Sequence, residues 1–178
     1  MPDFDLDRLS VIPYSPSLAQ RLSNSEFDCE NNDLNEFLKK DARIHYSERL
    51  AQTFVIMDGD RIAGFFSLLA DSLRLGEEET ADFRERGISY PSFPAVKIGR
   101  FGIDRGYKRK GIGKLAFKGI VGLVNNLREE IGCRFLTVDS KKEPPAICFW
   151  EDLGFKKNLK NNELRETVSY RFDLMNPE

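Results

Sequence analysis

The residues best suited to chemistry form a basic stretch with two glycines in the second half of the chain. Its sequence is Tyr107-Lys108-Arg109-Lys110-Gly111-Ile112-Gly113-Lys114. A glycine-bearing turn before a helix lets backbone N–H groups point at an anion, and the helix dipole adds about half a positive charge there. Six basic and no acidic residues lie between Arg105 and Lys118, so the side chains strengthen the same field. The pattern predicts a phosphate site, although a solvated basic helix end has the same composition.

Two better-known phosphate motifs do not fit this stretch. A Walker loop ends in Gly-Lys-Ser/Thr after four spacer residues, and that ending is missing here. The dinucleotide-binding fingerprint needs an earlier first glycine, which is also missing. The nucleotide folds built on those motifs are therefore excluded.

Histidine and cysteine offer little additional chemistry. The three cysteines, Cys29, Cys133 and Cys148, are odd in number and far apart, so they predict neither a disulfide framework nor a metal site. We expect reduced, mostly buried thiols, with Cys148 as a buried helix residue rather than a nucleophile. The single histidine, His45, lies near the end of an apolar helical pattern, which favours a packing role over a catalytic one.

The elements that position the basic stretch are a strand before it and a helix after it. Apolar residues keep a helical period from Ile112 to Ile131, for about five turns. Residues 95–103 predict the strand. Gly99 and Gly102 within it indicate a bulge or a close approach by another backbone, or a ligand lying against it.

The remaining patterns predict a mixed α/β fold. Strands are expected at 9–13, 53–57, 62–69, 135–138 and 167–174, with a hairpin turn at Asp58-Gly59-Asp60. Helices are expected after the N-cap residues Asn31-Asn32-Asp33 and from Pro144 to Leu153. Residues 77–86 predict a short solvated helix or loop, and Tyr90 to Pro94 should break regular structure. A hairpin, then strand, helix, strand, helix and strand gives a mixed sheet with a parallel core.

Length and charge limit the number of domains and the classes of partner. With 178 residues, of which 40% are hydrophobic and 31% charged, the chain predicts one globular domain over 1–178. A net charge of −2 does not point to nucleic acid or an anionic membrane. The acidic N-terminus differs from a secretory signal, and no apolar run reaches the ~18 residues of a membrane span. We expect a cytoplasmic protein with no membrane partner.

Several separated motifs have an order and spacing typical of one family. They lie at 100–104, 107–113, 138–140 and 146–155, the last containing Phe149-Trp150-Glu151-Asp152-Leu153-Gly154-Phe155. Together they resemble the GNAT superfamily of N-acetyltransferases. The resemblance implies a GNAT fold, in which a mixed central β-sheet with splayed parallel strands is flanked by helices.

The same resemblance implies acetyl-CoA as cosubstrate and no metal. Lys108 occupies the Gln/Arg position of the pyrophosphate turn, and Gly111 and Gly113 match its glycines. The strand end at 101–103 would pair with the pantetheine arm. The implied cofactor-binding residues are Phe101, Gly102, Ile103, Lys108, Arg109, Lys110, Gly111, Ile112, Gly113, Lys114 and Trp150.

The resemblance leaves the general acid unassigned. Family members commonly protonate the departing thiolate with a tyrosine, and Trp150 stands at that position. An indole N–H donates a hydrogen bond but cannot serve as a general acid. Either Trp150 only stabilises the thiolate, or another group or water supplies the proton, or the protein binds acetyl-CoA without turnover. Tyr90 and Ser140 are secondary candidates, and Glu143 replaces an asparagine that many members carry.

The N-terminal half resembles the GNAT branch that includes toxin-type acetyltransferases. The residues that carry this likeness are at 27–31, 34–42, 53–55, 90–95 and 98–100. Such toxins acetylate aminoacyl-tRNA, which requires a basic surface. Outside 105–118 the chain has 21 basic against 29 acidic residues, so we rank an amine of a small molecule or protein first and tRNA second. A homodimer is a further option for the assembly.

Overall fold

The computed structural model describes residues 6–159 and 166–176. It forms two compact units: unit 1 comprises Met1–Leu69 and Gly99–Gly122, and unit 2 comprises Ala70–Ile98 and Leu123–Glu178. The expectation of one domain over 1–178 stays a prediction. The first five residues of the acidic N-terminus lie outside the described residues. In the described part, none of the helices combines the length and apolar character needed to cross a membrane.

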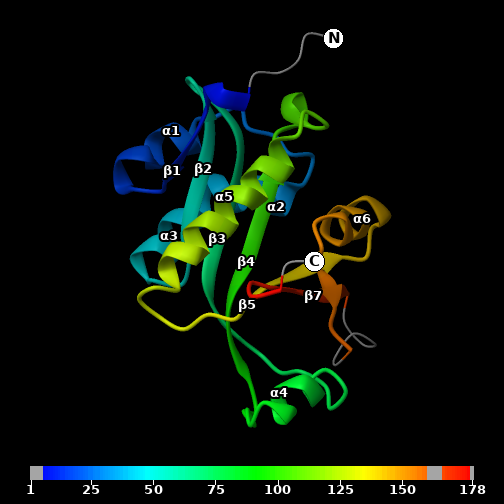
Figure 1. Ribbon diagram of the computed structural model, residues 1–178. Helices are drawn as coiled ribbons and strands as arrows, with labels where there is room; N and C mark the ends of the chain where they lie inside the picture. Colours follow the sequence, from blue (N-terminus) through cyan, green and yellow to red (C-terminus); the bar gives the residue numbers. More distant parts are fainter. Residues whose placement is uncertain (1–5, 160–165, 177–178) are drawn as a thin grey trace. The chain divides into compact units, whose positions relative to one another are not determined.

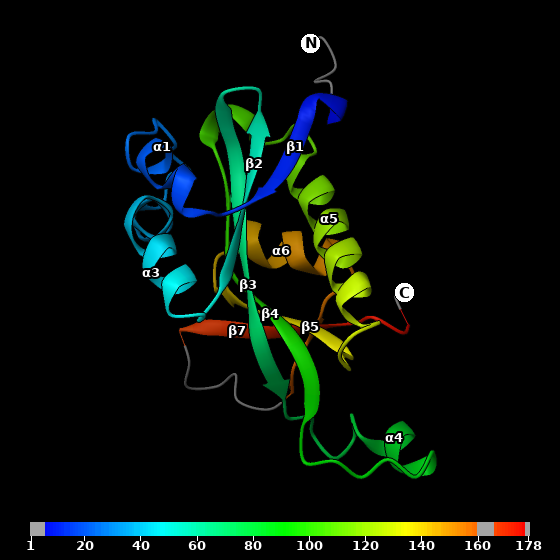
Figure 2. The same cartoon turned by 90° about the vertical axis from the view of Figure 1, so that its left-hand side faces the viewer.

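Unit 1 is built on an antiparallel set of strands with helices on both faces. Its strands are β1 (Leu9–Pro13), β2 (Gln52–Asp58) and the first part of β3 (Arg61–Leu73), paired in that order. Figure 2 shows α1 and α3 on one face of these strands and α5 on the other. The helical and 3-10 segments are η1 (Leu6–Arg8), η2 (Pro16–Leu18), α1 (Ala19–Ser23), α2 (Asn32–Glu36), the π-helical η3 (Phe37–Asp41), α3 (Ala42–Ser47), η4 (Arg105–Tyr107) and the part of α5 (Ile112–Leu127) up to Gly122.

Strand alternation decides which helices each residue of unit 1 packs against. Val55, Met57 and Phe65 are buried in one cluster with Phe37 and Leu38 of η3. Residues next in sequence, such as Ile56, point to the opposite face because successive strand side chains alternate. α5 buries Ile112, Ala116 and Ile120 at helical spacing. Both faces of the sheet are thus covered by helices. Because α5 packs on one of these faces, its first residues, which follow the basic stretch, are held in place.

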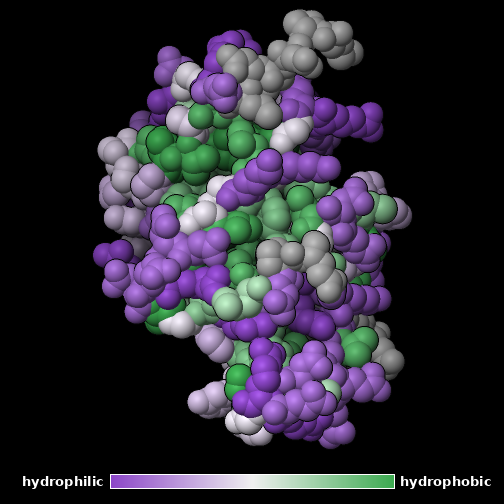
Figure 3. Space-filling model, viewed as in Figure 1, coloured by the Kyte–Doolittle hydropathy of each residue, from purple (hydrophilic) through white to green (hydrophobic). Residues whose placement is uncertain are grey.

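Unit 2 contains the parallel strand pair and the helix with the aromatic motif. β4 (Phe93–Ile103) starts in this unit and pairs in parallel with β5 (Phe135–Lys141), and β5 pairs antiparallel with β7 (Thr167–Asp173). β6 (Lys156–Lys157) adds an edge, and the helices are α4 (Ala81–Glu85) and α6 (Pro144–Asp152). Figure 1 shows α6 beside β7. Figure 3 shows mainly hydrophilic side chains over α4, whose Phe83 is buried.

The strand order of the whole sheet is β1-β2-β3-β4-β5-β7-β6. The parallel pairs of β4 and β5 run from Ala95↔Phe135 to Ile98↔Val138, although both strands continue beyond them. This confirms the predicted mixed sheet with a parallel core, as in the GNAT fold. β4 and β5 lose their pairing after Ile98, as expected for splayed strands.

Most elements lie where the sequence patterns predicted them, but several begin or end elsewhere; β3, for example, continues to Leu73, four residues beyond its predicted end at Leu69. β4 begins at Phe93 and includes Pro94, which was expected to precede the strand. Proline has no backbone N–H to donate to a neighbouring strand, and it is tolerated here because it lies near the start of β4. α5 ends at Leu127, because Glu129 and Glu130 make tighter bonds to Asn126 and Leu127. β5 continues to Lys141, three residues beyond the predicted end.

Candidate functional site

The basic stretch of unit 1 is a tight loop that leads into α5. Arg109 and Gly111 have left-handed φ values of 61° and 80°. Alternation of such residues with ordinary ones turns successive N–H groups toward one side, as in anion-binding nests. The N–H of Leu115 donates to the Gly111 carbonyl at 3.1 Å, so α5 begins within the loop. The first N–H groups of a helix have no partner inside it, and here they belong to the glycine-bearing segment.

A second segment, Asp28 to Glu30, holds the loop from behind. The ammonium of Lys108 donates to the Cys29 carbonyl at 3.1 Å and to Glu30 Oε2 at 2.5 Å. The Arg105 N–H donates to the Asp28 carbonyl at 2.8 Å. Lys108, expected to reach the cofactor, is therefore held by residues of the chain, and in this arrangement it positions the loop.

Asp28 is itself fixed by a small network of hydrogen bonds. Its Oδ1 accepts from the Glu30 N–H at 2.8 Å and from the Asn35 amide at 2.9 Å. These two hydrogen bonds lower the pKa of Asp28, and the bond from the backbone N–H of Glu30 has the larger effect. The motif at 27–31, which carried the likeness to one GNAT branch, thus has a structural role in unit 1.

Tyr107 anchors the start of the loop in the core. Its side chain is buried, and its hydroxyl donates to Asp58 Oδ2 at 3.0 Å. Burial, followed by this hydrogen bond, raises the pKa of Tyr107. The phenol therefore stays protonated near neutrality and serves as an anchor.

The end of β4 brings small residues close to the strands of unit 1. A Cβ on Gly102 would lie 2.9 Å from Phe65 Cε1 and 3.4 Å from Cys29 Sγ. One on Gly99 would lie 2.6 Å from Leu69 Cδ2. The close approach predicted at these glycines is confirmed: side chains lie against both, and a Cβ on Gly64 of β3 would lie 2.8 Å from the Gly102 carbonyl oxygen, so another backbone is near as well. Phe101 and Ile103 flank Gly102 and are half-buried.

Unit 2 contains Trp150, which the sequence motif is expected to place at the position of the family's tyrosine. It is 5% exposed and packs edge-on against Phe149 and Phe155, with ring centroids 5.0 and 5.2 Å apart. Such burial gives the indole a packing role whatever else it does. Its N–H remains a donor only.

The secondary acid candidates, Tyr90 and Ser140, both lie in unit 2. Tyr90 is 70% exposed. Ser140 is buried, and its hydroxyl donates to the Lys141 carbonyl at 3.1 Å. Glu143 is exposed at the N-cap of α6.

Two polar pairs of unit 2 were not predicted from the sequence. Tyr170 on β7 donates its hydroxyl to Glu151 Oε1 on α6 at 3.0 Å, and burial, then this bond, raises the pKa of Tyr170 to about 12. Lys97 on β4 and Asp139 on β5 form an ion pair at 2.6 Å, beside the last parallel pair of residues. Only the strand register and the packing of α6 could have revealed these pairs, since their members are 19 and 42 residues apart.

The cysteines and the histidine have structural surroundings. Cys29 and Cys133 are buried, and burial raises the pKa of each thiol. Cys148 is exposed, so its expected burial is wrong; it lies two residues from Trp150, and a helix turns about 100° per residue, which places it away from the buried face. His45 packs edge-on against Phe37 at 5.1 Å. The described residues contain no group of three or more side chains suited to a metal ion.

Comparison with known proteins gives a consistent family and fold. A family model described as "Acetyltransferase (GNAT) family" matches residues 19–155. A crystal structure of a KacT mutant has a TM-score of 0.76 at 21% identity and covers 92% of this chain and 94% of that chain. AtaT complexed with acetyl-methionyl-tRNAfMet has a TM-score of 0.75 at 20% identity, covering 94% and 95%. AtaTR bound with acetyl-CoA has a TM-score of 0.72 at 18% identity, covering 96% of each chain.

Proposed function

Because the protein belongs to the GNAT acetyltransferase family, we propose that it transfers the acetyl group of acetyl-CoA to a primary amine of a small molecule or a protein. The observation that carries the cosubstrate assignment is the loop before α5, with left-handed Arg109 and Gly111. Its N–H groups suit the pyrophosphate of the cosubstrate, which carries two negative charges. The cations between 105 and 118 complement that charge.

The residues divide into those that bind and those that position. Backbone N–H groups of Gly111 to Gly113 would hold the pyrophosphate, and Arg109, Lys110 and Lys114 would flank it. Lys108 acts as a positioning residue, because Glu30 and the Cys29 carbonyl hold its ammonium. The backbone of Phe101 to Ile103 would receive the pantetheine arm, as the resemblance implies.

The transfer step requires little from the side chains of the protein. The nitrogen lone pair of the neutral amine attacks the thioester carbon, the C–S bond breaks, and the coenzyme leaves as a thiolate that then takes up a proton. Trp150 can donate a hydrogen bond and cannot supply that proton. The hydroxyl of Tyr170 already donates its proton in a hydrogen bond to Glu151. Water or the ammonium formed by the attack therefore delivers it.

Charge favours a cationic or neutral acceptor over a polyanion. Outside residues 105–118 acidic residues exceed basic ones by eight. Within 105–118, Lys108 and Arg105 already pair with Glu30 and Asp28. We keep the cytoplasm as the expected compartment and a homodimer as an option for the assembly.

The test is binding followed by turnover. We expect isothermal titration to detect acetyl-CoA binding, and a thiol-release assay with a panel of primary amines to give turnover above an amine-free control. Acetylated products should appear in mass spectra. An absence of binding at about 100 μM acetyl-CoA, within the usual range of enzyme KM values, would refute the proposal.

A second candidate, acetylation of aminoacyl-tRNA, is favoured by the structural neighbours. One of them is AtaT in complex with acetyl-methionyl-tRNAfMet. The test replaces the amine panel by charged tRNA and compares low with high salt, since phosphate contacts weaken steeply as salt rises. Salt-sensitive acetylation of the charged tRNA, with no transfer to free amines, would favour this candidate over the first.

A further inference from the structure

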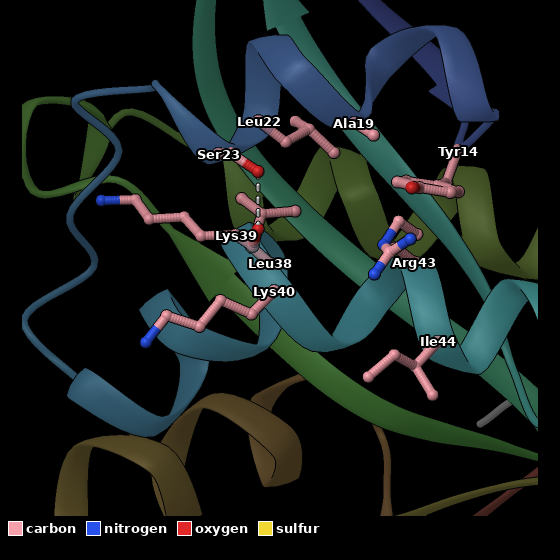
Figure 4. Close-up of a pocket in the computed structure, with 9 residues that line it drawn as sticks. All are labelled: Tyr14, Ala19, Leu22, Ser23, Leu38, Lys39, Lys40, Arg43 and Ile44. Atoms are coloured by element: carbon pink, nitrogen blue, oxygen red, sulfur yellow. Dashed lines mark hydrogen bonds between the residues drawn. The ribbon is translucent and has the colours of Figure 1, made fainter.

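A cavity of about 300 Å³ lies among the first helices of unit 1, and the function proposed above does not use it. Ala19, Leu22 and Leu38 give it an apolar floor, and Tyr14, Lys39 and Arg43 are among its polar lining residues. Figure 4 shows these side chains and the bond from Ser23 Oγ to the Lys39 carbonyl, 3.0 Å long, which ties α1 to η3. The cavity walls are therefore held together by the fold.

Tyr14 is the unusual member of this lining. It is 3% exposed, and its hydroxyl oxygen is buried without a hydrogen-bond partner among the described residues. Its N–H donates to the Thr53 carbonyl at 2.7 Å, and its ring packs against Tyr46 at 5.4 Å, so the side chain is fixed in place. A buried polar group without a partner is rare and costly, which makes this hydroxyl a donor in need of an acceptor.

Arg43 supplies positive charge next to Tyr14. Figure 4 shows its guanidinium beside the Tyr14 side chain. Burial raises the pKa of Tyr14, and the charge of Arg43 opposes that rise. Lys40 is already paired with Glu36 at 2.8 Å, whereas Arg43 and Lys39 form no ion pair with any described carboxylate. The polar end of the cavity is thus cationic and rich in donors.

We propose that this cavity binds a small organic carboxylate, with its oxygens accepting from Tyr14 and Arg43 and its apolar body on Ala19, Leu22 and Leu38. A planar carboxylate matches the guanidinium fork. The volume is at the small end of ligand pockets, which suits a body of about six carbons. Because the Tyr14 oxygen is covered, the ligand enters as the exposed Arg43 side chain changes rotamer.

The probes that test this are sodium hexanoate, hexanol and inorganic phosphate, titrated into isotopically labelled protein and followed by amide chemical shifts. We expect hexanoate to saturate with a Kd of about 1 mM, a normal efficiency for a ligand of this size. Hexanol lacks the charge and phosphate lacks the apolar body, so each should bind at least about 10-fold more weakly. Equal binding of hexanol and hexanoate, or no hexanoate binding at about 10 mM, would overturn the proposal.

Two variants locate the contacts. Tyr14→Phe removes only the unpaired hydroxyl and should weaken hexanoate binding about 3- to 10-fold, and Arg43→Gln about 10-fold or more. The control Arg74→Gln removes an exposed charge from unit 2 and should change nothing. All three variants should bind acetyl-CoA like the wild type, which separates this site from the cosubstrate site. If Tyr14→Phe binds hexanoate as tightly as the wild type, the hydroxyl is not a ligand contact and the proposal is wrong.

Discussion

Replacing Gly111 by alanine tests the loop through its backbone. Gly111 has a φ of 80° at the start of α5, and an L-residue in the left-handed region costs about 1–2 kcal/mol. For a chain of this size that cost lowers Tm by about 2–8 °C if the loop keeps its shape. If the loop instead relaxes, its N–H groups turn away from the pyrophosphate. A lost hydrogen bond to a charged group then weakens acetyl-CoA binding about 10-fold or more.

The assay combines thermal unfolding with isothermal titration of acetyl-CoA, and Gly119→Ala is the matched control. Gly119 lies in the middle of the same helix, and a Cβ there would meet nothing within 4 Å. Glycine is about 0.5–1 kcal/mol worse than alanine inside a helix. The control should therefore raise Tm and leave acetyl-CoA affinity unchanged, so the two variants move stability in opposite directions.

Gly111→Asp supplies the decisive result. It adds a negative charge at the proposed phosphate position, so it should weaken acetyl-CoA binding more than Gly111→Ala does. If Gly111→Asp binds acetyl-CoA as tightly as the wild type, the loop does not hold the pyrophosphate, even where Tm falls as expected.

Three further predictions concern other parts of the chain. Trp150→Phe keeps a ring but removes the indole N–H; thiol release should slow no more than about 10-fold, and complete loss would show that this N–H is essential. Asn31→Ala removes the cap whose side chain accepts from the Leu34 N–H and should lower the free energy of unfolding by about 1 kcal/mol in urea titration. Because the folded-state pKa of Tyr170 is raised to about 12, its contribution is complete below its ordinary value of 10.0 and is lost as pH rises toward 12. Urea titrations at one pH below 10 and one above 10 should thus show a larger fall in the free energy of unfolding for the wild type than for Tyr170→Phe. Equal falls for the two proteins would contradict the raised pKa.

Local patterns were sufficient to predict most elements of the fold. Asn31 caps α2 as its position before an apolar helical pattern indicated. Asp58-Gly59-Asp60 joins β2 to β3, and Gly59 has the positive φ that such turns require. These features depend on residues a few positions apart, so the sequence contains all the information needed to predict them.

Pairings between distant residues were not predictable in the same way. The motif predicts Lys108 at the cofactor, and only the structure shows that Glu30, 78 residues away, pairs with its ammonium. Cys148 was expected to be buried, and only the orientation of α6 on its strands shows that it faces solvent. Such contacts depend on the register of strands and the rotation of helices, which no local pattern encodes.

Residue spacing along the chain is enough to predict the family, the order of the elements and the position of the basic loop. The tertiary structure decided which charges the loop keeps for a ligand, since Asp28 and Glu30 reach it only after folding. It also decided that Tyr14 has a buried hydroxyl with no described partner beside Arg43, because these residues are brought together by packing of α1 and α3 against one face of the sheet.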